Sequence, residues 1–251
     1  MKKYLSILAG LLFFVGLLAP APAAHIIWVT RNFDTADTPA SPNDSGWTDL
    51  LTAHGHTVDR RVITALDTDD AACLELNAAD LIIISRDGIS GTYVSNAEEL
   101  QRWNGLTTPM INFHAFVARF TVWRWFASNQ TSVVGPLRAE EPDHAIFEGV
   151  SLDGSNQVLI HETSMNTLSF GSGNGIELAV DAANDRPWIV YWEPGVEYFS
   201  GSGQITGGPR LFFAAGGNSI PTQSGAENFN AEGERLFLNA VDFMLGQPRL
   251  K

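Results

Sequence analysis

Short apolar runs and helix-like hydrophobic spacings alternate along the first half of the chain. The apolar runs are rich in β-branched residues and predict four strands, at residues 25–30, 57–63, 80–85 and 109–113. Between them, apolar residues at helical spacing predict helices at residues 47–54, 69–76 and 95–105, and Phe116, Phe120 and Trp123 are spaced as one face of a further helix. The alternation predicts an α/β fold with a mainly parallel sheet.

From Thr131 onward, strand-like runs lie between glycine-rich turns. Runs at residues 158–160, 177–180, 188–192 and 210–214 predict more strands, and apolar spacing over residues 236–245 predicts a final helix. No segment is long enough to mark a linker. We therefore expect residues 24–251 to form one domain with a β-rich C-terminal portion.

Residues 1–23 have the pattern of a signal peptide. Lys2 and Lys3 precede an apolar run, and Ala21-Pro22-Ala23 supplies the small residues that signal peptidase reads. The run is shorter than the roughly 20 residues that cross a bilayer. We expect cleavage after Ala23, with Ala24 as the alternative, and a secreted or periplasmic protein without a membrane anchor.

The net charge and the cysteine content argue against some binding partners and against thiol chemistry. A net charge of −13 disfavours nucleic acid and anionic membranes, which bind clustered Lys and Arg. Cys73 is the one cysteine, so no disulfide forms within the chain. A buried, inert thiol is favoured over a nucleophile, because no helix start or glycine turn is placed to activate it.

Polar side chains follow several predicted strands, where parallel strands would bring their carboxyl ends to one edge. We predict that Arg31, Asn32, Arg86 and Asn218 bind a ligand there, and that Asp87, His114 and Glu193 supply hydrogen bonds to it. If the site is catalytic instead, Asp87 or Glu193 acts as a general base and His114 as an acid. Asp and Asn also cap helices and close turns, so a structural role is the alternative for each.

Three segments carry a resemblance to a known family. MINFHA at 110–115, DHAIFEGV at 143–150 and GPRLFFAAGGN at 208–218 resemble the trehalose-utilisation (ThuA-like) branch of the class I glutamine amidotransferase-like superfamily. The resemblance implies a flavodoxin-like three-layer sandwich and a setting in carbohydrate metabolism.

Departures from that superfamily concern its catalytic residues. Amidotransferases use a cysteine on a strand-to-helix elbow, activated by a histidine that a glutamate orients. The elbow falls near Phe113-His114-Ala115 and holds no cysteine, His161 and Glu162 are adjacent, and Gly217-Asn218 replaces a histidine. Glutamine hydrolysis through a thioester is therefore excluded.

Other motifs have simple structural explanations. His54-Gly55-His56 has metal-ligand residue types, but no third ligand is evident and a surface turn is favoured. We therefore expect neither a metal ion nor a cofactor in this protein. The aromatic residues at 123–126, 188–192 and 198–199 offer either sugar-stacking rings or core packing.

Three functions remain open. The favoured hypothesis is an exported domain that binds a carbohydrate or other small molecule at the strand ends without covalent catalysis. The alternatives are a sugar-directed hydrolase or isomerase with an Asp/Glu–His acid–base pair, and a non-catalytic interaction domain. The ligand and the oligomeric state are left open.

Overall fold

The structure is a computed structural model that describes residues 23–30, 44–86, 90–161, 163–215 and 227–246. Five parallel strands form the first half of its main sheet: β1 (His25–Val29), β2 (Thr57–Arg61), β3 (Leu81–Ile84), β4 (Met110–Asn112) and β11 (Arg210–Phe213). Their order is β2-β1-β3-β4-β11, the strand order of flavodoxin-like folds. The predicted fold class is thus confirmed.

Antiparallel strands extend the same sheet beyond β11. They are β10 (Pro187–Trp192), β9 (Ile176–Asp181), β6 (Leu137–Ala139) and β7 (Gln157–Val158), in that order. A small second sheet pairs β5 (Gln130–Val133) with β8 (Met165–Leu168). The sheet is therefore mixed: parallel from β2 to β11 and antiparallel from β11 to β7.

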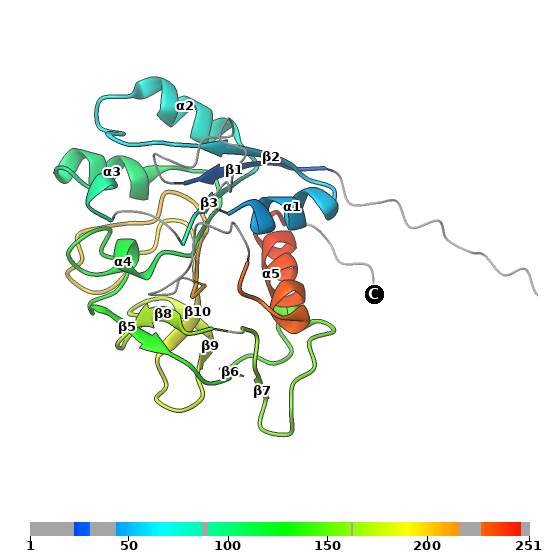
Figure 1. The fold of residues 1–251 in the computed structure, drawn as a ribbon. Coiled ribbons are helices and arrows are strands. Elements are labelled where there is room, and N and C mark those ends of the chain that lie inside the picture. The colour runs from blue at the N-terminus through cyan, green and yellow to red at the C-terminus, as the bar shows by residue number, and fades with distance from the viewer. Residues whose placement is uncertain (1–22, 31–43, 87–89, 162, 216–226, 247–251) are drawn as a thin grey trace, which may run out of the picture.

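Helices cover both sides of the parallel half (Figure 1). One side carries α1 (Ser45–Ala53) and α5 (Ala231–Met244), and the other carries α2 (Asp70–Ala78) and α3 (Ala97–Gly105). Short helical turns are α4 (Ala115–Ala118), η1 (Ser90–Thr92) and η2 (Ala145–Phe147). All four residues of β3 are fully buried, as expected for a strand beneath two helical layers.

Most of the candidate sugar-stacking rings belong to the core. Exposure is 0 to 1% for Trp123, Trp125, Phe126, Trp188, Trp192 and Tyr198. Trp125 stacks on Tyr198 with 5.2 Å between ring centroids, and Trp192 packs edge-on against Phe126. Phe126 also packs against Phe212 of β11, so these ring contacts stabilise the junction between the parallel and antiparallel halves.

The helix predicted from Phe116, Phe120 and Trp123 is wrong. The helical turn α4 ends at Ala118, and Arg119 adopts an extended backbone. The chain then folds back, so that the backbone N–H of Trp123 donates to Val117 O and that of Phe126 to Ala118 O. Tertiary backbone contacts therefore bury Trp123 without helical spacing, while Phe120 stays 43% exposed.

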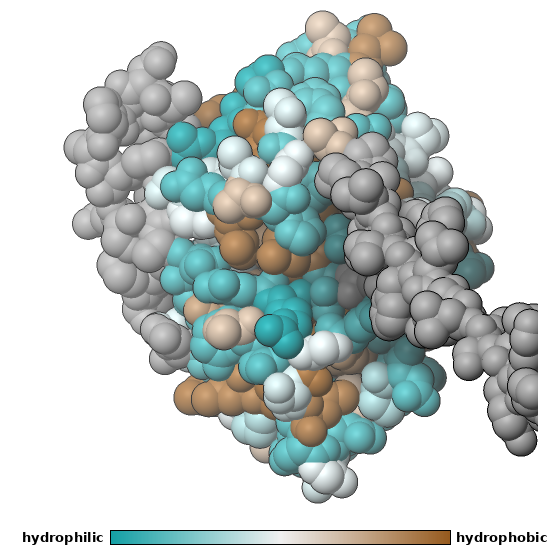
Figure 2. All heavy atoms as spheres, turned by 90° about the vertical axis from the view of Figure 1, so that its right-hand side faces the viewer, coloured by the Kyte–Doolittle hydropathy of each residue, from teal (hydrophilic) through white to brown (hydrophobic). Residues whose placement is uncertain are grey.

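The face that carries α1 and α5 is mostly hydrophilic, and its exposed hydrophobic side chains lie in separate patches (Figure 2). None of the described helices has the length and apolar composition required to cross a membrane. The predicted signal peptide, except for Ala23, lies outside the described residues.

Candidate ligand site at the strand ends

The candidate site lies where the strand order reverses. From β1 the chain continues to α1 and β2 on one side, whereas β3 leads toward β4 on the other. In open α/β sheets, ligands bind at the carboxyl ends of the strands beside such a reversal. Thr30 follows β1 and Ser85 follows β3, and both are buried there. The backbone N–H of Ser85 donates to Val29 O at 2.9 Å, which holds the two strand ends together.

A buried carboxylate, Asp44, joins these strand ends. Its Oδ2 accepts hydrogen bonds from Trp28 Nε1 at 3.0 Å, Thr30 Oγ1 at 2.9 Å and Ser85 Oγ at 2.6 Å. The residue is 2% exposed, and its Oδ1 has no hydrogen-bond partner in the structure. Three donors therefore fix one oxygen, while the other is buried without a donor.

The backbone of Asp44 explains why its side chain points toward the strands. Asp44 precedes α1 as its N-cap, with φ 70° in the left-handed region, and its side chain makes no capping hydrogen bond to the helix. Asp tolerates this conformation better than most residues. The usual capping interaction is thus given up, and the carboxylate lies against β1 and β3.

Arg86 extends the polar cluster from β3 toward the segment before α5. Its Nη1 donates to Asn228 Oδ1 at 2.6 Å, and its guanidinium lies 5.1 Å from the ring centre of Trp47. Asn228 Nδ2 in turn donates to Thr163 Oγ1 at 3.3 Å. This chain of contacts connects the parallel half of the protein to the β-rich segment.

Glu227 places a second carboxyl group beside Arg86. Burial and then the neighbouring Glu234 carboxyl raise the pKa of Glu227 to about 7, although the positive charge of Arg86 lowers it. Its Oε2 is buried and has no hydrogen-bond partner in the structure. A carboxyl group with a pKa near neutrality can both donate and accept a proton at physiological pH.

Two histidines and an asparagine complete this edge of the sheet. His114 is 4% exposed at the start of α4, and its backbone N–H donates to Asn112 Oδ1 at 2.7 Å. Asn112 Nδ2 is buried without a partner in the structure. His161 stacks on Trp188, its Nε2 lies 3.1 Å from Gly135 O, and its Nδ1 likewise has no partner.

Of the residues predicted for the site, Arg86 and His114 lie at this edge. Glu193 does not, and its expected convergence with them is wrong. It follows β10, and Trp192 at the end of β10 is paired with Arg210 at the beginning of β11. Because β10 is antiparallel to β11, its carboxyl end lies at the opposite edge of the sheet. Arg31, Asn32, Asp87 and Asn218 lie outside the described residues.

Sequence reasoning missed Asp44, Glu227 and Asn228. Asp44 stands directly before a predicted helix, where an aspartate is ordinarily a cap. Asn228 contacts Arg86 across 142 residues of sequence. The one sequence signal for Asp44 was its position as an acidic residue in the loop after the first strand, where ligand-binding residues often lie.

The strand-to-helix junction after β4 holds Phe113, His114 and Ala115. Cys73 lies on α2, partly exposed, with its Sγ 3.8 Å from Leu66 O. The thiol is therefore less buried than the sequence suggested.

A pocket of about 490 Å³ lies between the segment after α4 and the segment that joins β10 to β11. Phe120, Arg124 and Phe199 are among its lining residues. Two of its polar groups are bonded within the chain: Arg124 Nη1 donates to Ser202 O at 3.3 Å, and the Ser202 hydroxyl to Gln204 O at 3.2 Å. Although its volume suits a small ligand, the strand ends offer the stronger polar chemistry.

Comparisons with known proteins give likenesses in structure but none in sequence. No family model matches the sequence, and no curated protein matches it. Among solved structures, the chain is similar to a protein of Bacteroides uniformis described as ThuA-like, with 12% sequence identity and a TM-score of 0.47. The match covers 92% of this chain and 95% of the other.

Proposed function

We propose that this domain binds a small neutral ligand with several hydroxyl groups, such as a carbohydrate, at the carboxyl ends of β1, β3 and β4. The observation that carries the proposal is the Asp44 carboxylate, which is 2% exposed and keeps Oδ1 unpaired while three donors hold Oδ2. A buried polar atom without a partner is costly, and native proteins seldom keep one without a function.

The other side chains at this edge suit a polyhydroxylated ligand. A hydroxyl group both donates and accepts hydrogen bonds, and the edge supplies carboxylate acceptors at Asp44 and Glu227 and an amide donor at Asn112. Arg86 partly balances the negative charge, since its field lowers the pKa of Glu227. Mixed acceptors and donors favour a neutral ligand over a strongly charged one.

The test is a thermal-shift screen against monosaccharides and oligosaccharides, followed by calorimetry on any compound that binds. A ligand at 100 times its Kd stabilises the folded state by about 2.7 kcal/mol. We expect Asp44→Asn to abolish that ligand-induced shift. Glu193→Gln, at the opposite edge, is the matched control and keeps it. If no saccharide shifts the wild-type protein, or if both variants respond equally, the proposal is wrong.

The raised pKa of Glu227 supports a second candidate, acid–base catalysis on such a ligand. Glu227 would transfer the proton, and Arg86 would orient the substrate. The distinguishing measurement is turnover of chromogenic glycosides as a function of pH. Activity that depends on a group titrating near pH 7 and disappears in Glu227→Gln favours catalysis, whereas binding without turnover favours a binding domain.

The proposal includes export, on the strength of the basic start, the apolar run and the small residues at 21–23. N-terminal sequencing of protein recovered from the periplasm or medium tests it. Ala24 is the expected first residue, and an intact Met1 would contradict cleavage.

A further inference from the structure

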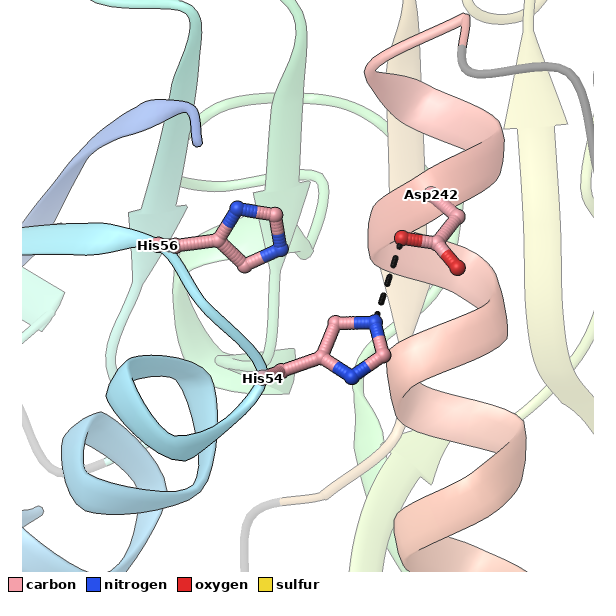
Figure 3. Close-up of side chains that lie close together, drawn as sticks. All are labelled: His54, His56 and Asp242. Carbon is pink, nitrogen blue, oxygen red and sulfur yellow. Dashed lines mark ion pairs between the residues drawn. The ribbon is translucent and has the colours of Figure 1, made fainter. Parts of the chain in front are cut away.

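Three metal-ligating side chains converge at the other edge of the sheet, near the amino ends of β1 and β2. His54 ends α1, His56 directly precedes β2, and Asp242 lies near the end of α5. One ligand atom from each lies within 4.8 Å of the others. Figure 3 shows both imidazoles projecting from the α1–β2 turn toward the Asp242 carboxylate.

The backbone fixes the positions of the two histidines. Gly55 between them has φ 104°, a conformation that residues with a side chain rarely adopt. The backbone N–H groups of His54 and His56 donate to Leu50 O and Leu51 O, closing the end of α1. The two imidazoles therefore belong to one rigid helix cap, so little conformational freedom is lost when they bind a common ion.

His56 supplies an independent sign of a missing ligand. Its side chain is buried, with the residue 6% exposed, and Nδ1 faces the backbone N of Ala24 at 3.4 Å. Its Nε2 is also buried and has no hydrogen-bond partner in the structure. In Figure 3 this nitrogen is on the side of the ring that faces the other two ligands.

We infer that His54, His56 and Asp242 bind a divalent transition-metal ion, with Zn²⁺ as the ion that fits the ligand set best. Two imidazole nitrogens and one carboxylate oxygen are typical zinc ligands, whereas Ca²⁺ and Mg²⁺ require oxygen-rich sites. Zinc bonds of about 2.0–2.1 Å place neighbouring tetrahedral ligands about 3.3 Å apart. The 3.4 Å between His54 Nε2 and Asp242 Oδ1 already matches this spacing.

Three protein ligands leave one tetrahedral position for water, as in open zinc sites. His54 is exposed at the surface, so solvent reaches the site. The ion would connect the α1–β2 turn to α5. Asp242 is the third ligand that the spacing of His54 and His56 could not reveal, because it comes from a helix almost at the other end of the chain.

The test uses purified protein without a histidine tag, stripped with a chelator and titrated with ZnCl₂ in a calorimeter. We expect one equivalent to bind, and Co²⁺ to give the visible absorption of tetrahedral coordination. His56→Gln and Asp242→Asn each weaken Zn²⁺ binding at least about tenfold, since loss of even an outer-shell partner costs that much. If His56→Gln fails to fold, His54→Gln takes its place, because His54 is exposed, and we expect the same loss of Zn²⁺ affinity.

The chain supplies a matched control in a second histidine–carboxylate pair. His25 Nε2 lies 3.1 Å from Asp59 Oδ2, and the two side chains are 39% and 42% exposed. Within the described residues, they belong to no group of three potential ligands. We expect His25→Gln to leave Zn²⁺ affinity unchanged. Absence of saturable one-to-one binding in the wild type, or an equal loss in His25→Gln, would overturn the inference.

Discussion

Replacing Asp44 with alanine tests whether its carboxylate organises the strand ends. The change removes the acceptor for Trp28 Nε1, Thr30 Oγ1 and Ser85 Oγ. A buried donor without an acceptor costs about 1–3 kcal/mol. The Trp28 indole cannot turn elsewhere and should incur most of that cost, whereas the two hydroxyls can rotate toward other acceptors and should lose about 1 kcal/mol each.

The backbone adds to this loss. Asp44 has φ 70°, and alanine is less stable than aspartate in the left-handed region, by about 1 kcal/mol. The total expected loss is therefore about 4–6 kcal/mol in the free energy of unfolding. Asp44→Asn keeps one acceptor oxygen but removes the charge, so we expect a smaller loss of about 1–2 kcal/mol.

Urea denaturation followed by tryptophan fluorescence and circular dichroism measures both values. Asp49→Ala is the matched control, because Asp49 lies exposed on the same helix and should change stability by less than about 0.5 kcal/mol. If Asp44→Ala lies within about 1 kcal/mol of the wild type, the three hydrogen bonds do not hold the strand ends together and the reasoning fails.

Three further changes test other parts of the structure. Because the folded-state pKa of Glu227 is raised from 4.5 to about 7, its protonation stabilises the fold fully below about pH 4.5, and this contribution is lost as the pH rises through 7. Glu227→Gln should match the wild type near pH 4.5 and be more stable by about 1–2 kcal/mol at pH 8, as urea titrations at both pH values would reveal. Gly233→Ala should destabilise the protein by about 1–3 kcal/mol, since the added methyl group would overlap Ile160 O, and an unchanged Tm would contradict that packing. Arg210→Leu should cost about 3 kcal/mol or more, since its fully buried guanidinium donates to the carbonyls of Asn104, Leu106, Thr108 and Pro209, and chemical denaturation would measure the loss.

Local pattern was sufficient to predict the parallel half of the fold. The strand β3 is an unbroken apolar run and the helix α5 has an apolar face at helical spacing, so tertiary contacts reinforce what the sequence already favours. The strand β5 was missed, because three of its four residues are polar and its pairing with β8 depends on a distant segment. The helix predicted through Trp123 failed for a similar reason, since backbone contacts to α4 bury that ring.

The site was only partly predictable, because the local sequence does not determine whether a strand pairs parallel or antiparallel with its neighbour. The prediction that Arg86 and His114 lie at the carboxyl ends of parallel strands agrees with the structure, in which they follow β3 and β4. Glu193 follows β10, a strand as apolar as those before Arg86 and His114, but β10 pairs antiparallel with β11. Nothing within residues 188–192 specifies that direction. The residues that do join Arg86 come from segments whose position depends on the complete fold.

The reversed direction of β10 also explains which groups replace Glu193 at the site. It brings the amino end of β10 to the edge that holds the candidate site, where Trp188 stacks on His161 and donates from Nε1 to Ala214 O. His161 pairs in turn with Phe229, which adjoins Glu227 and Asn228. The antiparallel portion therefore holds in place the segment that carries the Glu227 carboxyl group. A variant that loosens this contact, such as Trp188→Ala, should weaken ligand binding at Arg86 without touching it directly, and unchanged affinity in a folded Trp188→Ala protein would contradict that coupling.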